Sequence, residues 1–440
     1  MIKAFASRLV RSVIESIGAA TPLPFRAVFP NGMEITGGRG EPEVTIRIKS
    51  VRAALRTVIF GHVGFLESYF DGEIDLEGDL RKIMAIGFSS GFDESSGMLV
   101  KIRNRWHGLR FNNRTGASPK ENARFHYGLG AEFYSKMLDD PYLMYTCAYY
   151  QQPEQTILEA QIAKMEHVAR KVRLEPGERV IDMGCGFGGF MFYAAEEHGV
   201  HVTGVNTTTE QADWVKAKIA AKGLENQITM HEADVRQGFG VYDKVVSIGV
   251  LEHAGRHQLR DLIRAHANAL KPGGLGLIHF IGHVGDRDTD FFIRKYIFPG
   301  GWIPSLSKAI DAMEAEGLEI LDVENLRRHY ALTLDAWTEK FDANWETIRA
   351  MDTDRFDERF LRIWRTYLIG CAEMFRSANS QTNLFQVLFS KGNVDTESYP
   401  MTLEHLYEEE PSAGEREGLA PRKEEPRRSA GESSAPRAAG

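Results

Sequence analysis

A glycine-rich segment carries the clearest chemical signal in the sequence. Asp182 ends a predicted strand, and three glycines follow it, separated by single residues: Gly184, Gly186 and Gly188. Glycines let the backbone approach a ligand closely, and the free amides of a helix N-terminus can bind it. The spacing differs from the G-x-G-x-x-G pattern of dinucleotide-binding enzymes. An acid before the glycines can hold a cationic amine, so we predict a site for S-adenosylmethionine (SAM), with an ordinary strand-to-helix turn as the alternative.

The segment after the next predicted strand lacks the acid that usually binds ribose hydroxyls. A Rossmann fold normally ends this strand in Asp or Glu, whereas this chain continues with Gly204–Gln211. We expect Asn206, Thr207 and Gln211 to bind the ribose through neutral hydrogen bonds, or Glu210 to turn inward. The predicted cofactor-binding set is completed by Tyr145, Asp234 and Ile248.

Alternating strands and helices are expected to position these residues. The alternation extends from about residue 126 to residue 395 and predicts a parallel, doubly wound α/β sheet of the Rossmann type. Its short apolar strands are predicted at residues 179–183, 200–205, 244–248 and 276–280, with a helix at 211–221.

The rest of the chain divides into three parts. Residues 1–90 are predicted to form a smaller α+β domain, with a strand at Val44–Ile48 and a helix at Ala53–Tyr69. Residues 91–125 are expected to be a basic linker, either a solvated surface or a contact for anionic lipid headgroups. Residues 408–440 contain almost no large apolar side chain and are expected to be disordered.

The first twenty residues predict an amphipathic basic helix. Apolar residues recur there at helical spacing, with basic residues on the other faces. The helix either packs on its own domain or lies in a membrane interface. No segment reaches the roughly 18 to 20 apolar residues that span a bilayer. The apolar positions are Ile2, Phe5, Leu9, Val13 and Ile17.

Composition narrows the class of protein. A chain of 440 residues with 43% apolar side chains suits two domains with buried cores. Three cysteines make a disulfide framework unlikely and favour a reducing, cytoplasmic compartment. The net charge of −8 argues against a nucleic-acid binder, and no metal site is expected.

Several ordered motifs resemble the cyclopropane fatty-acyl-phospholipid synthases and, more distantly, the mycolic acid cyclopropane synthases. Gly204–Gln211 matches the family's G-x-T-[IL]-S-x-x-Q in spacing and in its closing Gln, and Leu66–Gly72 resembles the family's smaller domain. The likeness is dense over residues 126–391. Further matching segments are His126-Tyr127, Tyr145–Tyr149, Glu252-His253, His279–Gly282, Lys295–Gly301, Asn325–Trp337, Phe375-Arg376 and Gln386–Ser390.

The resemblance implies an enzyme that uses SAM to turn the double bond of an unsaturated phospholipid acyl chain into a cyclopropane ring. Methyl transfer to the alkene gives a carbocation, and bound bicarbonate is implied as the base that removes its proton. The implied catalytic residues that hold bicarbonate are Cys147, Glu252, His279, Ile281 (through its backbone) and Tyr330. Taken singly, each could be structural. The resemblance also implies a bilayer substrate, a peripheral position at the inner membrane surface and a homodimer.

Some residues depart from the family pattern. Gly128 replaces an acid and Ala254 a valine, while Phe280 replaces a small polar residue and Phe187 a tryptophan. We expect the two phenylalanines to lie near the cofactor and the acyl chain, so the product stays open. A methyl- or methylene-branched chain is the alternative to ring closure, and a soluble-substrate methyltransferase is a further alternative. Candidate aromatic residues for stabilising the cation are Tyr149, Phe280, Tyr296, Trp302 and Phe375.

Overall fold

The computed structural model describes most of the chain. The described residues are 2–92, 102 and 129–407. The predicted tail, most of the predicted basic linker and the His126-Tyr127 motif lie outside them, so these expectations stay predictions. By its internal contacts the chain forms a large unit, residues 1–399, and a small one, residues 400–440, in which the short helix η4 (Glu404–Leu406) is described.

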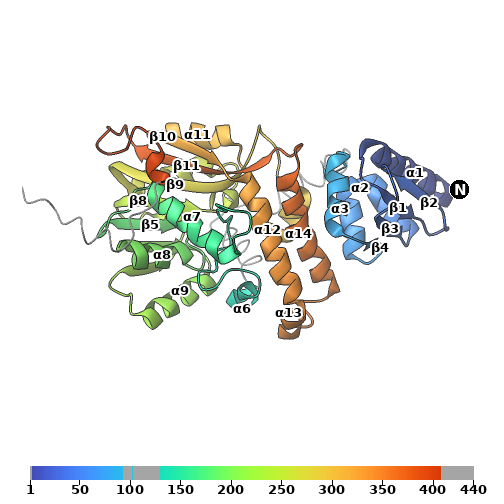
Figure 1. Ribbon diagram of the computed structural model, residues 1–440, viewed down its shortest axis with the longest axis horizontal. Coiled ribbons are helices and arrows are strands. Elements are labelled where there is room, and N and C mark those ends of the chain that lie inside the picture. Colours follow the sequence, from blue (N-terminus) through green and yellow to red (C-terminus); the bar gives the residue numbers. More distant parts are fainter. Residues whose placement is uncertain (1, 93–101, 103–128, 408–440) are drawn as a thin grey trace, which may run out of the picture. The chain divides into compact units, whose positions relative to one another are not determined.

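A seven-stranded sheet forms the centre of the large unit's second part (Figure 1). The strand order is β10-β11-β9-β8-β5-β6-β7, and neighbouring strands from β9 to β7 are parallel. The predicted doubly wound α/β sheet is therefore confirmed, with β11 running antiparallel between β9 and β10. The strands are β5 Arg179–Met183, β6 His201–Asn206, β7 Ile228–Glu232, β8 Tyr242–Ile248, β9 Leu270–His283, β10 Leu318–Asn325 and β11 Thr382–Lys391.

Helices bury both faces of this sheet, which explains why its central strands are apolar at successive positions. Val180 of β5 packs in a core with α7, α8 and α9, whereas the next residue, Ile181, packs in a core with α10 and α11. The helices are α7 Ile157–Lys171, α8 Gly189–His198, α9 Thr209–Lys222, α10 Leu259–Ala269 and α11 Leu306–Glu314.

The strand order creates a topological switch beside β5. The chain passes from β5 to β6 and β7 on one side, and then returns to β8 on the other side. Open α/β sheets bind ligands at the carboxyl ends of the strands where the order reverses. The segments that follow β5, β6 and β8 therefore meet at the expected ligand site.

Several further helices belong to the same part of the large unit. Helices α12 and α14 lie alongside each other between β10 and β11 in the chain (Figure 1). Their aromatic residues pack with Phe133 of α6, which stacks on Phe356 at 5.5 Å. The elements are α6 Gly130–Ser135, η1 Val235–Gln237, η2 Leu251–His253, the π-helix η3 Ile293–Ile297, α12 Arg327–Ala343, α13 Trp345–Met351 and α14 Glu358–Arg376.

The first 92 residues contain a separate four-stranded sheet of order β2-β1-β3-β4 with three helices. Ser50 caps α2 by accepting a hydrogen bond from Ala53 N at 2.9 Å. The elements are α1 Ile2–Ala20, β1 Phe25–Val28, β2 Glu34–Gly37, β3 Val44–Ile48, α2 Val51–Phe70, β4 Ile74–Glu77 and α3 Leu80–Ser89.

The second half of α1 packs on this small sheet. Val10 and Ile14 are buried in the same core as Phe25. A Cβ added at Gly18 would lie 2.8 Å from Gly37 Cα, so the two glycines permit a close helix-to-strand approach. The docked alternative is thus favoured for this half, and the side chains of residues 2–9 are outside the described set. No described helix combines the length and apolar character needed to cross a membrane.

Candidate active site

The glycine turn after β5 requires glycine for two different reasons. Gly184 has φ 85°, and a Cβ there would lie 2.3 Å from Val250 Cγ2. Gly188 has φ 77° and is the N-cap of α8, so it begins the helix in a conformation that L side chains rarely adopt. The backbone can therefore turn sharply from the sheet and present the N-terminus of α8 to a ligand.

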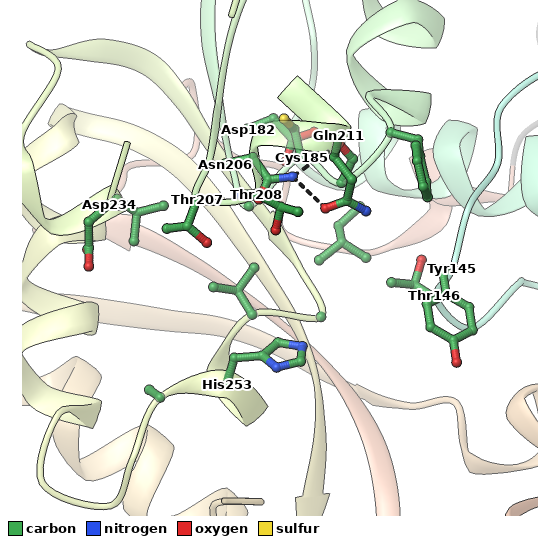
Figure 2. Close-up of a pocket in the computed structure, with 18 of the residues that line it drawn as sticks. Tyr145, Thr146, Asp182, Cys185, Asn206, Thr207, Thr208, Gln211, Asp234 and His253 are labelled. Atoms are coloured by element: carbon green, nitrogen blue, oxygen red, sulfur yellow. Dashed lines mark hydrogen bonds between the residues drawn. The ribbon is translucent and has the colours of Figure 1, made fainter. Parts of the chain in front are cut away.

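A cavity at this switch point brings the predicted cofactor residues together. Figure 2 shows Asp182, Asn206, Thr207 and Asp234 on one side of it and Tyr145 on the other. Gly188 alone among the predicted residues is not in the wall, and it is instead the N-cap of α8. The predicted residues in the wall are Tyr145, Asp182, Gly184, Gly186, Asn206, Thr207, Gln211, Asp234 and Ile248.

Neutral amides take the place of the usual ribose-binding acid. Asn206 Nδ2 donates to Gln211 Oε1 at 2.8 Å and to Gly186 O at 3.2 Å (Figure 2). This links the end of β6 to the glycine turn before any ligand binds. Glu210 is exposed and is not in the cavity wall. The geometry therefore favours the neutral alternative, and ribose binding itself stays a prediction.

A buried lysine that the sequence analysis missed lies beneath the cofactor cavity. Burial raises the pKa of Asp182 to about 7, and the positive charge of Lys164 partly offsets this rise. Burial also lowers the pKa of Lys164 to about 8. Its Nζ donates to Thr146 Oγ1 at 2.8 Å. The signal that identifies Lys164 is a charged residue on the core face of α7, four residues after the buried Ala160 and four residues before the buried Val168.

Helix α7 also fixes the segment that connects the two halves of the site. Gln161 Nε2 donates to Met144 O at 3.1 Å and to Thr146 O at 2.9 Å. Asp139 Oδ1 accepts a bond from Met144 N at 2.9 Å. Because both side chains bind backbone atoms, they set where Tyr145 and its neighbours lie.

The Asp234 carboxylate is already paired within its own turn. Arg236 Nε donates to Oδ1 at 2.8 Å, and a second guanidinium nitrogen bonds Oδ2. Burial acts to raise the pKa of Asp234, but the bonds from Arg236 hold it below its ordinary value. Asp234 therefore faces the cavity as a carboxylate that shares its lone pairs with a neighbouring cation.

A second cavity adjoins the first and contains all five residues predicted to hold bicarbonate: Cys147, Glu252, His279, Ile281 and Tyr330. Most of its remaining lining is apolar or aromatic. Both cavities share wall residues, namely Tyr145, Thr146, Gly249, His253 and Phe298. Thr146 and His253 were not predicted as site residues, although each is next in sequence to one that was.

Glu252 and His279 present polar atoms to this second cavity. Glu252 Oε1 accepts a bond from Ile281 N at 2.5 Å, while Oε2 has no hydrogen-bond partner among the described residues. Burial raises the pKa of Glu252 to about 7. Gln386 Nε2 lies 3.2 Å from His279 Nδ1 and can donate to it, and in that tautomer the ring proton is on Nε2. That Nε2 is also unpartnered within the described part of the chain.

Cys147 and Tyr330 complete the wall as neutral groups. The Cys147 thiol donates to Ala148 O at 3.2 Å, and burial raises its pKa, so it stays protonated. Burial likewise raises the pKa of Tyr330, whose ring packs on Phe375 at 4.7 Å. The cavity therefore offers the donors His279 Nε2 and Tyr330 O–H opposite the acceptor Glu252.

The alternation of β9 corrects one expectation. His279 and Ile281 face the second cavity, so Phe280 points to the opposite face of the sheet, where it packs on Phe385 at 6.0 Å. The expectation that Phe280 borders the acyl chain is wrong. Of the five candidate aromatics, Trp302 and Phe375 line this cavity, and Tyr149 instead stacks on His167 at 4.3 Å.

Comparisons with known proteins agree with this geometry. The family model described as mycolic acid cyclopropane synthetase matches residues 115–387. The chain is 33% identical to a probable fatty acid methyltransferase from Pseudomonas putida, and the match covers 88% of this chain and 96% of that protein. It is 34% identical to the cyclopropane-fatty-acyl-phospholipid synthase of Escherichia coli K12, and this match covers 80% of this chain and 89% of that protein.

A solved structure shows the same likeness in three dimensions. The mycolic acid cyclopropane synthase CmaA1, complexed with SAH and CTAB, superposes with a TM-score of 0.57 and 31% identity. The match covers 62% of this chain and 98% of that one. With the family model matching more than half of the chain, this protein belongs to the mycolic acid cyclopropane synthetase family of SAM-dependent methyltransferases.

Proposed function

We propose that this enzyme adds a methylene bridge, derived from the methyl group of SAM, across the double bond of an unsaturated phospholipid acyl chain. The observation that carries the proposal is a pair of adjoining cavities. One lies at the switch point of the sheet, and the other is apolar but contains Glu252, His279 and Tyr330. The net reaction converts alkene and SAM into cyclopropane, S-adenosylhomocysteine and a proton.

The cofactor cavity suits SAM in charge and shape. Bound SAM supplies an electrophilic methyl group on a cationic sulfur. Asp182 would hold its ammonium group, and the glycine turn would let the backbone approach its amino acid end. The relative solved with SAH supports this assignment. Tyr145 and Thr146 lie where the two cavities meet, so the methyl group would face the acyl chain there.

The residues of the second cavity fit bicarbonate. This ion has one hydroxyl donor and oxygens that accept. The same wall contains the acceptor Glu252 Oε2, which has no partner among the described residues, and donors on His279 and Tyr330. Bound bicarbonate would supply a base without a permanent buried side-chain charge, which is costly in an apolar site.

The chain's own residues prepare this chemistry in three ways. Neutral His279 and Tyr330 donate hydrogen bonds without placing a positive charge beside a developing cation. Glu252, with a pKa of about 7, can take up a proton near neutral pH. Aromatic faces at Trp302 and Phe375 lie in the same wall and can stabilise positive charge on the substrate.

The lipid class and the location in this proposal are supported by the relatives' names and by the apolar cavity. A bilayer substrate implies peripheral binding to the inner membrane surface, and a homodimer is the expected assembly. Sedimentation with vesicles and light scattering test these two points. A branched acyl product is the alternative outcome, since hydride shift and loss of a different proton would follow the same methyl transfer.

Lipid mass spectrometry tests the function directly. The protein is incubated with unsaturated phospholipid vesicles and methyl-labelled SAM. A product heavier by one CH2 and resistant to ozone supports ring closure, while an ozone-cleavable product supports a methylene branch. Absence of label from every lipid would overturn the proposal and favour a soluble substrate.

A further inference from the structure

A buried histidine outside the implied catalytic set faces the apolar cavity. His283 is 7% exposed and lines this cavity. Its Nδ1 is hydrogen bonded to Thr382 Oγ1 at 3.2 Å, whereas its Nε2 has no partner among the described residues. A buried polar atom without a hydrogen bond costs free energy. The atom is therefore placed to bind a polar group that enters the cavity.

The position of His283 along β9 indicates which part of a substrate it meets. His279, Ile281 and His283 alternate onto one face of the strand, so all three face the same cavity. Four residues of strand separate the two histidines by about 13 Å. Extended alkyl bonds of about 1.5 Å at angles near 111° cover this distance in about ten bonds. A mid-chain double bond lies about that far from its ester.

His283 is the last residue of β9 and lies next to an exposed segment of the chain. His279 is buried deep in the sheet, whereas the residues that follow His283, 284–288, are all exposed. That exposed loop is charged, and Asp286 pairs with Arg256 at 3.0 Å. A lipid that enters from this side would place its polar end near His283 and its hydrocarbon toward His279.

Two hydroxyls complete the polar end. The Thr382 hydroxyl can donate to His283 Nδ1, which leaves the ring proton on Nε2. Thr289, also buried in this wall, accepts a bond from Ile303 N at 2.8 Å and keeps its own proton for donation. Burial and nearby Arg287 lower the pKa of His283 to about 4, so the ring is neutral at pH 7.

We propose that His283, oriented by Thr382, binds the ester carbonyl of the acyl chain and thereby places the double bond beside His279 and Glu252. This inference rests on the proposed function. It adds that the contact with the ester fixes the position of the acyl chain along the cavity. The hydrogen bond runs from His283 Nε2–H to the carbonyl oxygen. It makes the enzyme selective for ester-linked over ether-linked lipids with the same chains.

A competition experiment tests the subsite. Vesicles contain equal amounts of a monounsaturated diacyl phospholipid and its dialkyl ether counterpart, and mass spectrometry counts labelled product from each. The product ratio equals the ratio of kcat/KM values, so it does not depend on how much enzyme is folded. We expect the wild type to favour the ester about five-fold, the discrimination that one hydrogen bond supplies.

Variants separate recognition from folding. In His283→Leu and in Thr382→Val the ratio should fall to about one. His266→Leu is the matched control, because His266 is fully buried on α10 and lines neither cavity. It should keep the wild-type ratio. A wild-type ratio of one, or an unchanged ratio in both test variants, would overturn the subsite alone. If the wild type labels neither lipid, the proposed function fails and the subsite with it.

Discussion

The two cavities of the active site are built in opposite ways. In the cofactor cavity, polar side chains already bind one another: Asn206 holds Gln211, and Arg236 holds Asp234. In the apolar cavity, Glu252 Oε2 and His279 Nε2 lack partners within the described chain. The first site is organised before its ligand arrives. In the second site, buried polar atoms are available to form hydrogen bonds with a ligand, and such bonds are strongest in an apolar environment.

The comparison predicts that damage to one cavity leaves the other intact. Glu252→Gln has the largest expected effect, because the amide cannot take up a proton. We expect kcat to fall about 10³-fold. The Kd for SAM should not change, since Glu252 is not in the wall of the cofactor cavity. Labelled transfer to lipid gives kcat, and calorimetry gives the Kd. A matching loss of SAM affinity would contradict the separation.

A substitution at Lys164 should affect the cofactor cavity. Lys164→Met leaves Asp182 buried without its nearby positive charge and removes one of the two positive charges that act on Asp139. Removing one member of a buried group of charges should lower the free energy of unfolding by about 3 kcal/mol. SAM should also bind about tenfold more weakly, because less Asp182 is ionised at neutral pH. Urea unfolding and calorimetry measure the two effects.

The matched control for this variant is Lys171→Met on the same helix. Lys171 is equally buried, but it pairs with Glu324 at 2.7 Å and lines neither cavity. It should lose comparable stability and keep the wild-type Kd for SAM. If both variants lose SAM affinity equally, Lys164 acts only through general stability.

The pH dependence of SAM binding and that of kcat should report on different cavities, through one buried acid in each. Burial raises the pKa of both Asp182 and Glu252 to about 7. In the proposed function the ionised form of Asp182 binds the ammonium of SAM, so we expect bound SAM to lower the pKa of Asp182. The Kd should therefore fall up to about tenfold per unit as pH rises toward 7, and level off above it. At saturating SAM, kcat should also rise through about pH 7, because ionised Glu252 is the proposed proton acceptor.

Substitution assigns each inflection to its residue. Glu252→Gln should remove the pH dependence of kcat near 7 and leave that of the Kd for SAM. Titrations of both quantities between pH 5.5 and pH 8.5, a span of about 1.5 units on either side of the expected inflection, provide the test. A Kd profile that flattens in this variant would mean that the two acids titrate as a coupled pair.

The difference between the cavities also explains what the sequence could predict. The predicted cofactor residues from Asp182 to Gly188 and from Asn206 to Gln211 lie in short continuous segments next to strands. Local chemistry and spacing were enough to predict them as parts of one site, and the structure brings all but Gly188 of the predicted set to one cavity wall. The apolar cavity joins Cys147, Glu252, His279 and Tyr330 from distant parts of the chain, and no local pattern links them. Only the family resemblance brought these residues together before the fold was known.

Two particular residues show where sequence reasoning stopped. Lys164 was missed because a lysine in an amphipathic helix normally faces solvent. Phe280 was judged by its place next to His279, although strand alternation sends neighbours to opposite faces. Applied to β9 from the start, the same alternation would have excluded Phe280 and found His283.

The smallest expected effect comes from a substitution at Phe280. Phe280→Leu shortens a fully buried side chain on the face opposite the apolar cavity. We expect it to lower the free energy of unfolding by about 1 kcal/mol, measured by urea unfolding, because it removes part of a buried apolar side chain. The ratio of ring-closed to branched product should stay at the wild-type value. Trp302→Leu, which alters the cavity wall itself, should change that ratio. A product shift in Phe280→Leu alone would mean that the face of β9 behind His279, and not the cavity wall, controls how the cation is resolved.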